Sequence, residues 1–162
     1  MRERRNTLPY LGCLLLLAVA PSCLAQEAKV RVINGTNGRP LPKLAVSISF
    51  LYGKKYDKEI PANYQASLNL ETDENGEARF KFPQPPPVHF SAQVRVDWSH
   101  WYCGCAILGS TEDLVREGIN GPLSESDEKK FAARYKAAPS EILFIFRPLS
   151  FFERLLYPLM KE

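Results

Sequence analysis

Segments in which apolar and polar residues alternate are the feature that most limits the fold of this chain. Such alternation has the two-residue period of a strand that buries one face and exposes the other. It is cleanest in residues 89–98, where every second residue from 90 to 98 is apolar and lies on one face, and the four residues between them are polar: Phe90, Ala92, Val94, Val96 and Trp98 against Ser91, Gln93, Arg95 and Asp97. The same period occurs in four other segments, at residues 28–33, 44–52, 68–72 and 78–82. We therefore predict a mostly β protein.

Short turn signals separate these segments. Asn and Gly tolerate a positive φ angle, so the Asn-Gly pairs in residues 34–38 and 73–76 favour tight turns. We expect residues 73–76 to close a hairpin between the strands that flank them. The prolines at 83 and 85–87 follow directly, and they end a strand because proline has no N–H to donate.

Residues 142–146 are apolar at every position, which predicts a central strand covered on both faces. In residues 148–162, Ser150 and Glu153 have the spacing of a helix capping box. We expect this C-terminal helix to cap the outer face of the central strand with its apolar stripe. Polar capping residues also predict a helical insertion at about 110–136.

Together these segments predict one all-β domain over residues 26–147, with minor C-terminal helices. Five or six short strands with turn signals between them are typical of a β-sandwich. The length of the chain fits a single domain with one hydrophobic core.

The N-terminus, residues 1–25, has the three parts of a cleavable signal peptide. Three arginines lie within the first five residues, an apolar run follows at 11–20, and the segment ends on Ala25. The run is shorter than the roughly 20 residues of a membrane span. We predict an exported protein, periplasmic or extracellular, with no transmembrane span after cleavage. A retained anchor, or a lipoprotein cut before Cys23, remains an alternative.

Charge and motifs narrow the function classes. The formal net charge of the whole chain is +3, and removal of the arginine-rich signal brings it closer to neutral. A nucleic-acid partner is therefore not expected, because such proteins carry a concentrated basic patch. The chain lacks the HExxH and GxSxG motifs and a Gly-rich phosphate loop. We expect a non-enzymatic binding or interaction module without a cofactor, and its partner is a protein or a glycan.

One cluster of residues could carry chemistry: His100, Cys103 and Cys105. Three interpretations stay open for it. The two cysteines could form a disulfide, with each other or between chains, since export favours oxidation. They could bind a soft metal together with His100. They could also be small buried residues in ordinary packing.

Aromatic residues surround this cluster and suggest a second kind of site. Trp98, Trp101 and Tyr102 could form a platform for sugar rings, with His100 beside them. Packing of these rings in the core is the alternative. A carbohydrate-binding accessory domain is thus one candidate function, and a thiol-redox or soft-metal protein is another.

Two stretches carry a resemblance to a known family. Residues 30–42, VRVINGTNGRPLP, and 72–80, TDENGEARF, resemble carboxypeptidase-regulatory-like domains. This resemblance implies a transthyretin-like, Greek-key β-sandwich, a fold that hosts many functions. Residues 100–105, HWYCGC, and 147–155, RPLSFFERL, resemble uncharacterised exported bacterial proteins with that sandwich, and this implies no particular activity.

Overall fold

The computed structural model describes residues 26–52, 64–97, 99–102, 105–131 and 133–156. The predicted signal peptide, residues 1–25, lies outside these ranges, and its cleavage stays a prediction. The described strands are β1 (Glu27–Asn34), β2 (Ala45–Leu51), β3 (Tyr64–Glu71), β4 (Glu77–Lys81), β5 (His89–Val94), β6 (Trp101–Tyr102), β7 (Ala106–Ser110), β8 (Ile119–Asn120) and β9 (Glu141–Pro148). The described helices are α1 (Thr111–Glu117), α2 (Glu125–Phe131) and α3 (Phe151–Leu156).

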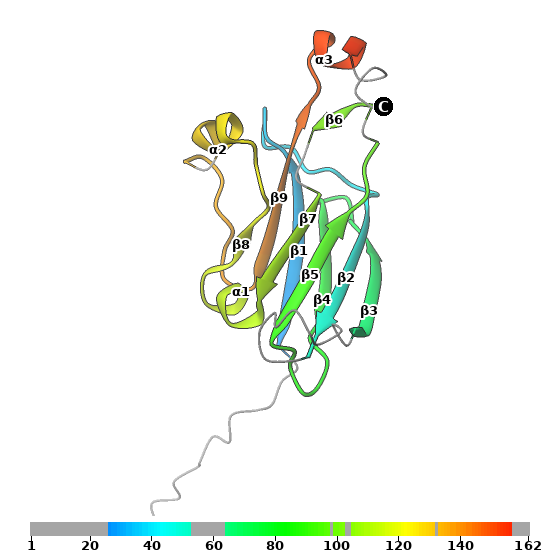
Figure 1. The fold of residues 1–162 in the computed structure, drawn as a ribbon, viewed down its shortest axis with the longest axis vertical. Helices are drawn as coiled ribbons and strands as arrows, with labels where there is room; N and C mark the ends of the chain where they lie inside the picture. Colours follow the sequence, from blue (N-terminus) through cyan, green and yellow to red (C-terminus); the bar gives the residue numbers. More distant parts are fainter. Residues whose placement is uncertain (1–25, 53–63, 98, 103–104, 132, 157–162) are drawn as a thin grey trace, which may run out of the picture.

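The strands form two sheets that pack face to face (Figure 1). One sheet has the order β4-β1-β9-β6, with β8 also paired to β9, and the other has the order β3-β2-β5-β7. The predicted β-sandwich with short helices is therefore confirmed. Its assignment to the transthyretin-like Greek-key topology stays a prediction.

The alternating faces meet in the core between the sheets. Along β5, Phe90, Ala92 and Val94 are buried, and each alternates with a more exposed residue. Burial of each large apolar side chain contributes roughly 1.5–3 kcal/mol before chain entropy opposes it. This period-2 pattern is what sets the register of each strand against its neighbours.

β9 is the central strand that the sequence predicts, with Glu141 to Phe146 all buried. It runs parallel to β1, and Val32 is the partner of Phe144. Ile142, Phe144 and Phe146 face the main core, while Leu143 and Ile145 face outward. That outer face packs against Phe131 of α2 and Ile33 of β1 in a second, smaller core.

The expected capping by the C-terminal segment 148–162 is therefore wrong for the residues described. α3 forms where the Ser150–Glu153 capping box predicts it, but none of its residues is buried. α2 already covers the outer face of β9. α3 begins only after the end of β9, at the extreme of the sandwich (Figure 1).

The turn at residues 73–76 is present, but it does not close a hairpin. β3 pairs with β2, whereas β4 pairs with β1 in the other sheet. The turn is fixed by Asp73, whose Oδ1 accepts the N–H groups of Asn75 and Glu77. A hairpin and a crossing between sheets bury the same alternate residues, so the local pattern does not distinguish them.

The helices follow their capping signals. Ser110 is the N-cap of α1 and accepts the N–H of Asp113, and Gly118 is the C-cap with φ 76°. The helical part of the predicted 110–136 insertion ends earlier than expected, since α2 ends at Phe131. In the part of the chain that is described, no helix has the length and apolarity needed to cross a bilayer.

Candidate functional site

His100 and Trp101, two of the residues predicted as a site, lie at one end of the sandwich, beside the base of α3. Trp101 of β6 is the partner of Pro148 in β9, and the N–H of Leu149 donates to the carbonyl of His100 at 2.9 Å. Trp98 and Cys103 lie outside the described residues, and only the backbone of Tyr102 is described. The fold thus brings the 99–102 segment next to residues far away in the sequence.

Asp97, Ser99 and His100 form an exposed group at this end. One Asp97 oxygen accepts the Ser99 N–H at 2.9 Å and its hydroxyl at 2.6 Å, and the other lies 2.8 Å from His100 Nδ1. Hydrogen bonds from the Ser99 side chain and backbone, and then from His100, lower the Asp97 pKa to about 2. Ser99 Oγ also lies on Nδ1, at 2.9 Å.

This arrangement differs from a catalytic triad. A Ser-His-Asp relay places the carboxylate on one imidazole nitrogen and the hydroxyl on the other. Here Asp97 and Ser99 share Nδ1, so the histidine cannot take a proton from serine on one side while being oriented from the other. The hydrogen bonds of this group stabilise the local turn that leads into β6.

Trp101 is half-buried and packs against the main core. Part of its ring is therefore already used for packing, and it supports the position of β6 on β9. The aromatic platform for sugars would need this residue together with Trp98 and Tyr102. The carbohydrate-binding interpretation stays a prediction.

Cys105 is buried and disulfide-bonded. The other cysteines, Cys13, Cys23 and Cys103, lie outside the described residues, so its pairing with Cys103 stays a prediction. A sulfur in a disulfide offers no thiolate to a metal. In this oxidised form Cys105 therefore cannot be a ligand of the predicted soft-metal site. Over the described ranges, no three His, Cys, Asp or Glu side chains are grouped as a metal site.

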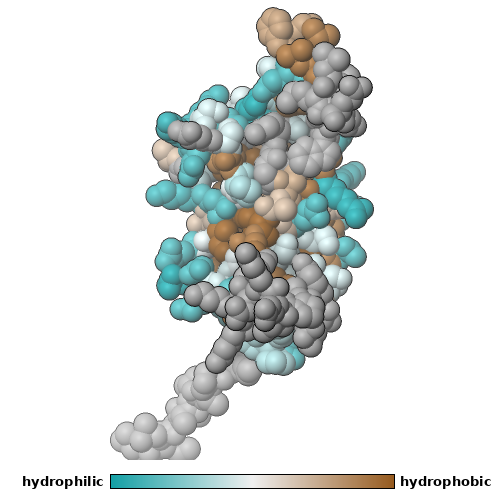
Figure 2. Space-filling view, viewed as in Figure 1, coloured by the Kyte–Doolittle hydropathy of each residue, from teal (hydrophilic) through white to brown (hydrophobic). Residues whose placement is uncertain are grey.

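α3 lies at this end with an orientation that differs from the sequence prediction. Its large apolar side chains are mostly in solvent, with exposed fractions of 75% for Phe151, 73% for Phe152, 64% for Leu155 and 51% for Leu156. At 3.6 residues per turn these four positions occupy one arc of about 140° around the helix. Figure 2 shows α3 as a strongly hydrophobic tip at the end of the molecule.

The polar side of α3 is the side that is fastened to the domain. Arg147, at the end of β9, donates two hydrogen bonds to the Glu153 carboxylate, at 2.8 and 2.7 Å. Its Nε also reaches the Asp127 carboxylate of α2 at 3.4 Å. Glu153 in turn accepts the Ser150 N–H at 2.7 Å, as in a capping box.

The helix is therefore amphipathic, but its apolar face points to solvent and its polar face points to the domain. A surface helix normally turns its apolar stripe to the core and its charges to solvent. Here Glu153 faces the domain through Arg147, and the apolar arc faces outward. The exposed arc offers about 500 Å² of apolar surface if each side chain contributes roughly 200 Å² when fully exposed. Contiguous patches of this size on a monomer often mark binding sites.

We expect the Arg147–Glu153 anchor to survive mild acid. Hydrogen bonds from Arg147 and Ser150 lower the Glu153 pKa from 4.5 to about 2. A depressed carboxyl pKa stabilises the fold fully above its unfolded value, and this contribution is lost as the pH falls through about 2. A titration followed by carbon NMR of the Glu153 carboxyl should show this low midpoint. Arg147→Gln should raise the midpoint toward 4.5, and an unmoved midpoint would contradict the anchor.

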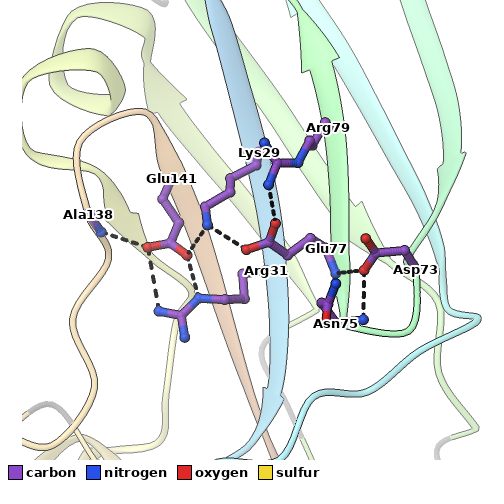
Figure 3. A network of polar contacts seen from close by, with 8 residues as sticks. All are labelled: Lys29, Arg31, Asp73, Asn75, Glu77, Arg79, Ala138 and Glu141. Atoms are coloured by element: carbon purple, nitrogen blue, oxygen red, sulfur yellow. Dashed lines mark hydrogen bonds and ion pairs between the residues drawn. The ribbon is translucent and has the colours of Figure 1, made fainter.

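A second polar cluster lies on the outer face of the sheet that contains β1, β4 and β9, at the end away from α3 (Figure 3). The Glu77 carboxylate of β4 pairs with Lys29 of β1 and, at 2.8 Å, with Arg79. Glu141 of β9 is 2% exposed and pairs with Arg31 of β1. Burial favours neutral Glu141, but hydrogen bonds from Arg31 and from the Ala138 N–H outweigh it, so its pKa is lowered.

This cluster acts as a clamp between strands. A hollow of about 200 Å³ lies beside it, lined by Glu27, Ala28, Lys29, Arg79, Pro139 and Ser140. Both cations of that lining already pair with Glu77, so they are not placed to hold a further anion. The clamp ties β1 to β4 and β9 and gives no sign of ligand chemistry.

Comparisons with known proteins identify no family. No protein-family model and no curated protein matches the chain. Among solved structures the chain is similar to the full-length major pilin SpaD from Corynebacterium diphtheriae, with 13% sequence identity and a TM-score of 0.40. The match covers 76% of this chain and 30% of the pilin chain. We draw no functional conclusion from a similarity of this size.

Proposed function

We propose that this protein is an exported, non-enzymatic interaction module that binds its target through the apolar arc of α3. The observation that carries this proposal is the outward orientation of Phe151, Phe152, Leu155 and Leu156 on a helix fastened by its polar side. Complete burial of about 500 Å² would be worth at most about 12 kcal/mol at roughly 25 cal/mol per Å². Association costs reduce this figure strongly, so we expect weak and reversible attachment through α3.

The topology places α3 at the end of the domain opposite to the start of β1. β1 and β9 are parallel, so the start of β1 and the helix that follows β9 lie at opposite ends of the sheet. Figure 1 shows the start of β1 and α3 separated by the length of the sandwich. This placement keeps α3 clear of the start of β1.

The geometry around His100 supports a role without catalysis. Asp97 and Ser99 both contact the same ring nitrogen of His100, which stabilises a turn but does not form a proton relay. The carbohydrate alternative would rest on Trp101, which packs partly against the core. The four apolar side chains of α3, by contrast, are exposed and none of the residues of this helix is buried.

A test uses cell envelopes from the exporting organism, which contain lipids, proteins and glycans together. We expect the processed protein to co-sediment with these envelopes, and the double variant Phe152→Ala/Leu155→Ala to bind at least about tenfold more weakly. Alanine preserves the helix while it removes the apolar surface. Leu108→Ala is the matched control, because Leu108 is 50% exposed but lies in β7, away from α3.

Three results would overturn the proposal. The first is equal binding of the double variant and the unmodified protein, which would place the contact elsewhere. The second is the absence of envelope binding by the unmodified protein. A loss of binding in Leu108→Ala equal to that of the double variant would show that α3 is not the specific surface.

A further inference from the structure

We infer that the occupant of the α3 surface is a lipid bilayer, into whose interface the helix inserts its two phenylalanines and two leucines. This inference rests on the proposed function and names its target. It is carried by three features of the tip: its shape and position, the arrangement of charge around the arc, and the area it offers.

The shape of the tip favours a planar and deformable target. α3 lies at the extreme of the long axis, past the last residues of both sheets, and no other labelled element extends beyond it (Figure 1). Phe151 and Phe152 are 75% and 73% exposed, so they project rather than line a hollow. A projecting tip needs a matching groove in a protein partner, whereas a bilayer accepts it without shape complementarity. Among the described elements, both sheets and the other two helices lie behind the tip (Figure 1).

The side chains suit the boundary between headgroups and acyl chains. The two phenylalanine rings pack edge to face, with centroids 5.8 Å apart, and form one compact wedge. Interfacial helices bury such an apolar face roughly 5–10 Å into the bilayer. On the helical wheel no charged residue falls between the four apolar positions.

The charges of α3 lie where insertion would leave them in water or among headgroups. Glu153 is bound to Arg147 on the domain side. Arg154 is exposed and borders the arc, from which a long side chain can extend to the headgroups. α3 has no other basic residue, so attraction to anionic lipid is not the main source of affinity. We therefore expect binding that changes little with salt.

The area of the tip sets the strength of binding and argues against a second copy of this chain. Two tips packed on each other would bury about 1,000 Å² in total, below the roughly 1,200–2,000 Å² of stable specific interfaces. About 500 Å² of apolar surface in a bilayer is comparable to a single acyl chain, which gives marginal and reversible membrane binding. Attachment through α3 is therefore expected to be transient.

The experiment is flotation of the processed protein with unilamellar vesicles of pure phosphatidylcholine. We expect the unmodified protein and Leu108→Ala to float with the vesicles at high lipid concentration. Phe152→Ala/Leu155→Ala should bind at least about tenfold more weakly. Addition of phosphatidylglycerol to the vesicles, or of salt to the buffer, should change binding of the unmodified protein by less than about threefold. Unchanged thermal unfolding of the double variant serves as the check that it is folded.

The possible failures can be told apart. Envelope binding through α3 without vesicle binding, lost when the envelopes are treated with protease, overturns the lipid inference and leaves a protein partner for the same surface. Dimers that the double variant no longer forms, without vesicle binding, also overturn it and indicate a second copy. Equal flotation of the double variant would show that lipid contacts another part of the protein. Absence of both envelope and vesicle binding overturns the proposed function as well.

Discussion

Replacement of Phe144 by alanine is expected to lower the free energy of unfolding by about 3–5 kcal/mol, the usual cost of removing a fully buried phenylalanine. Phe144 has no exposed surface and lies in the middle of β9, where it is the partner of Val32 in β1 and its side chain belongs to the main core. Its ring packs against that of Phe146, with centroids 6.3 Å apart. The cavity left by its removal would be lined by strands that cannot collapse without loss of pairing. Urea denaturation of both proteins measures the difference.

Phe152→Ala is the control for this prediction, because it makes the same substitution at a site that is 73% exposed. We expect it to change the free energy of unfolding by no more than about 0.5 kcal/mol. Similar losses in the two variants would mean that α3 is packed against something in solution. That result would contradict the outward orientation on which the proposed function depends.

Replacement of Gly118 by alanine is expected to destabilise the protein by more than about 2 kcal/mol. Gly118 ends α1 with φ 76° and ψ 168°, a backbone conformation that is essentially restricted to glycine. A Cβ atom there would lie 2.1 Å from the Ala138 carbonyl oxygen and 2.9 Å from Ala137 Cβ. These two residues belong to the loop that leads into β9, so the clash would displace the entry to the central strand.

The matched control is Glu117→Ala, at the preceding exposed position in the last turn of α1. We expect a change of less than about 0.5 kcal/mol for it, because alanine favours helix and Glu117 is not buried. Thermal unfolding of both variants supplies the comparison. A Gly118→Ala protein as stable as the control would show that the loop moves aside freely.

Much of the fold could be predicted from local patterns. Period-2 alternation located β1, β2, β4 and β5, because one face of each of these strands is buried against the opposite sheet. The continuous apolar run located β9, which is the one strand buried on both faces in the described ranges. Ser110 and Gly118 marked the ends of α1 because caps are local interactions.

Pairing between distant segments could not be predicted in the same way. The 73–76 turn joins the two sheets, since β4 pairs with β1 rather than with β3. β6 and β8 are too short to show a period. Each is a strand only because it pairs with β9. Such pairings depend on tertiary context, which a local alternation pattern does not contain.

The orientation of α3 depends on the same kind of distant contact. Its apolar stripe alone favours packing on β9, which is the usual use of such a stripe. The position on β9 is instead taken by Phe131, whose burial depends on the path of the 121–140 segment. Arg147, directly before the capping box, was the one sequence signal for the outcome, because it pairs with Glu153 and turns the polar side of α3 inward.

The most direct test of this account is the fraction of protein bound to cell envelopes, measured side by side for the unmodified protein, Phe152→Ala/Leu155→Ala and Leu108→Ala. The account predicts that the double variant binds at least about tenfold more weakly than the other two while all three unfold at the same temperature. Equal binding by all three proteins would contradict the claim that α3 is the surface through which this protein meets its target.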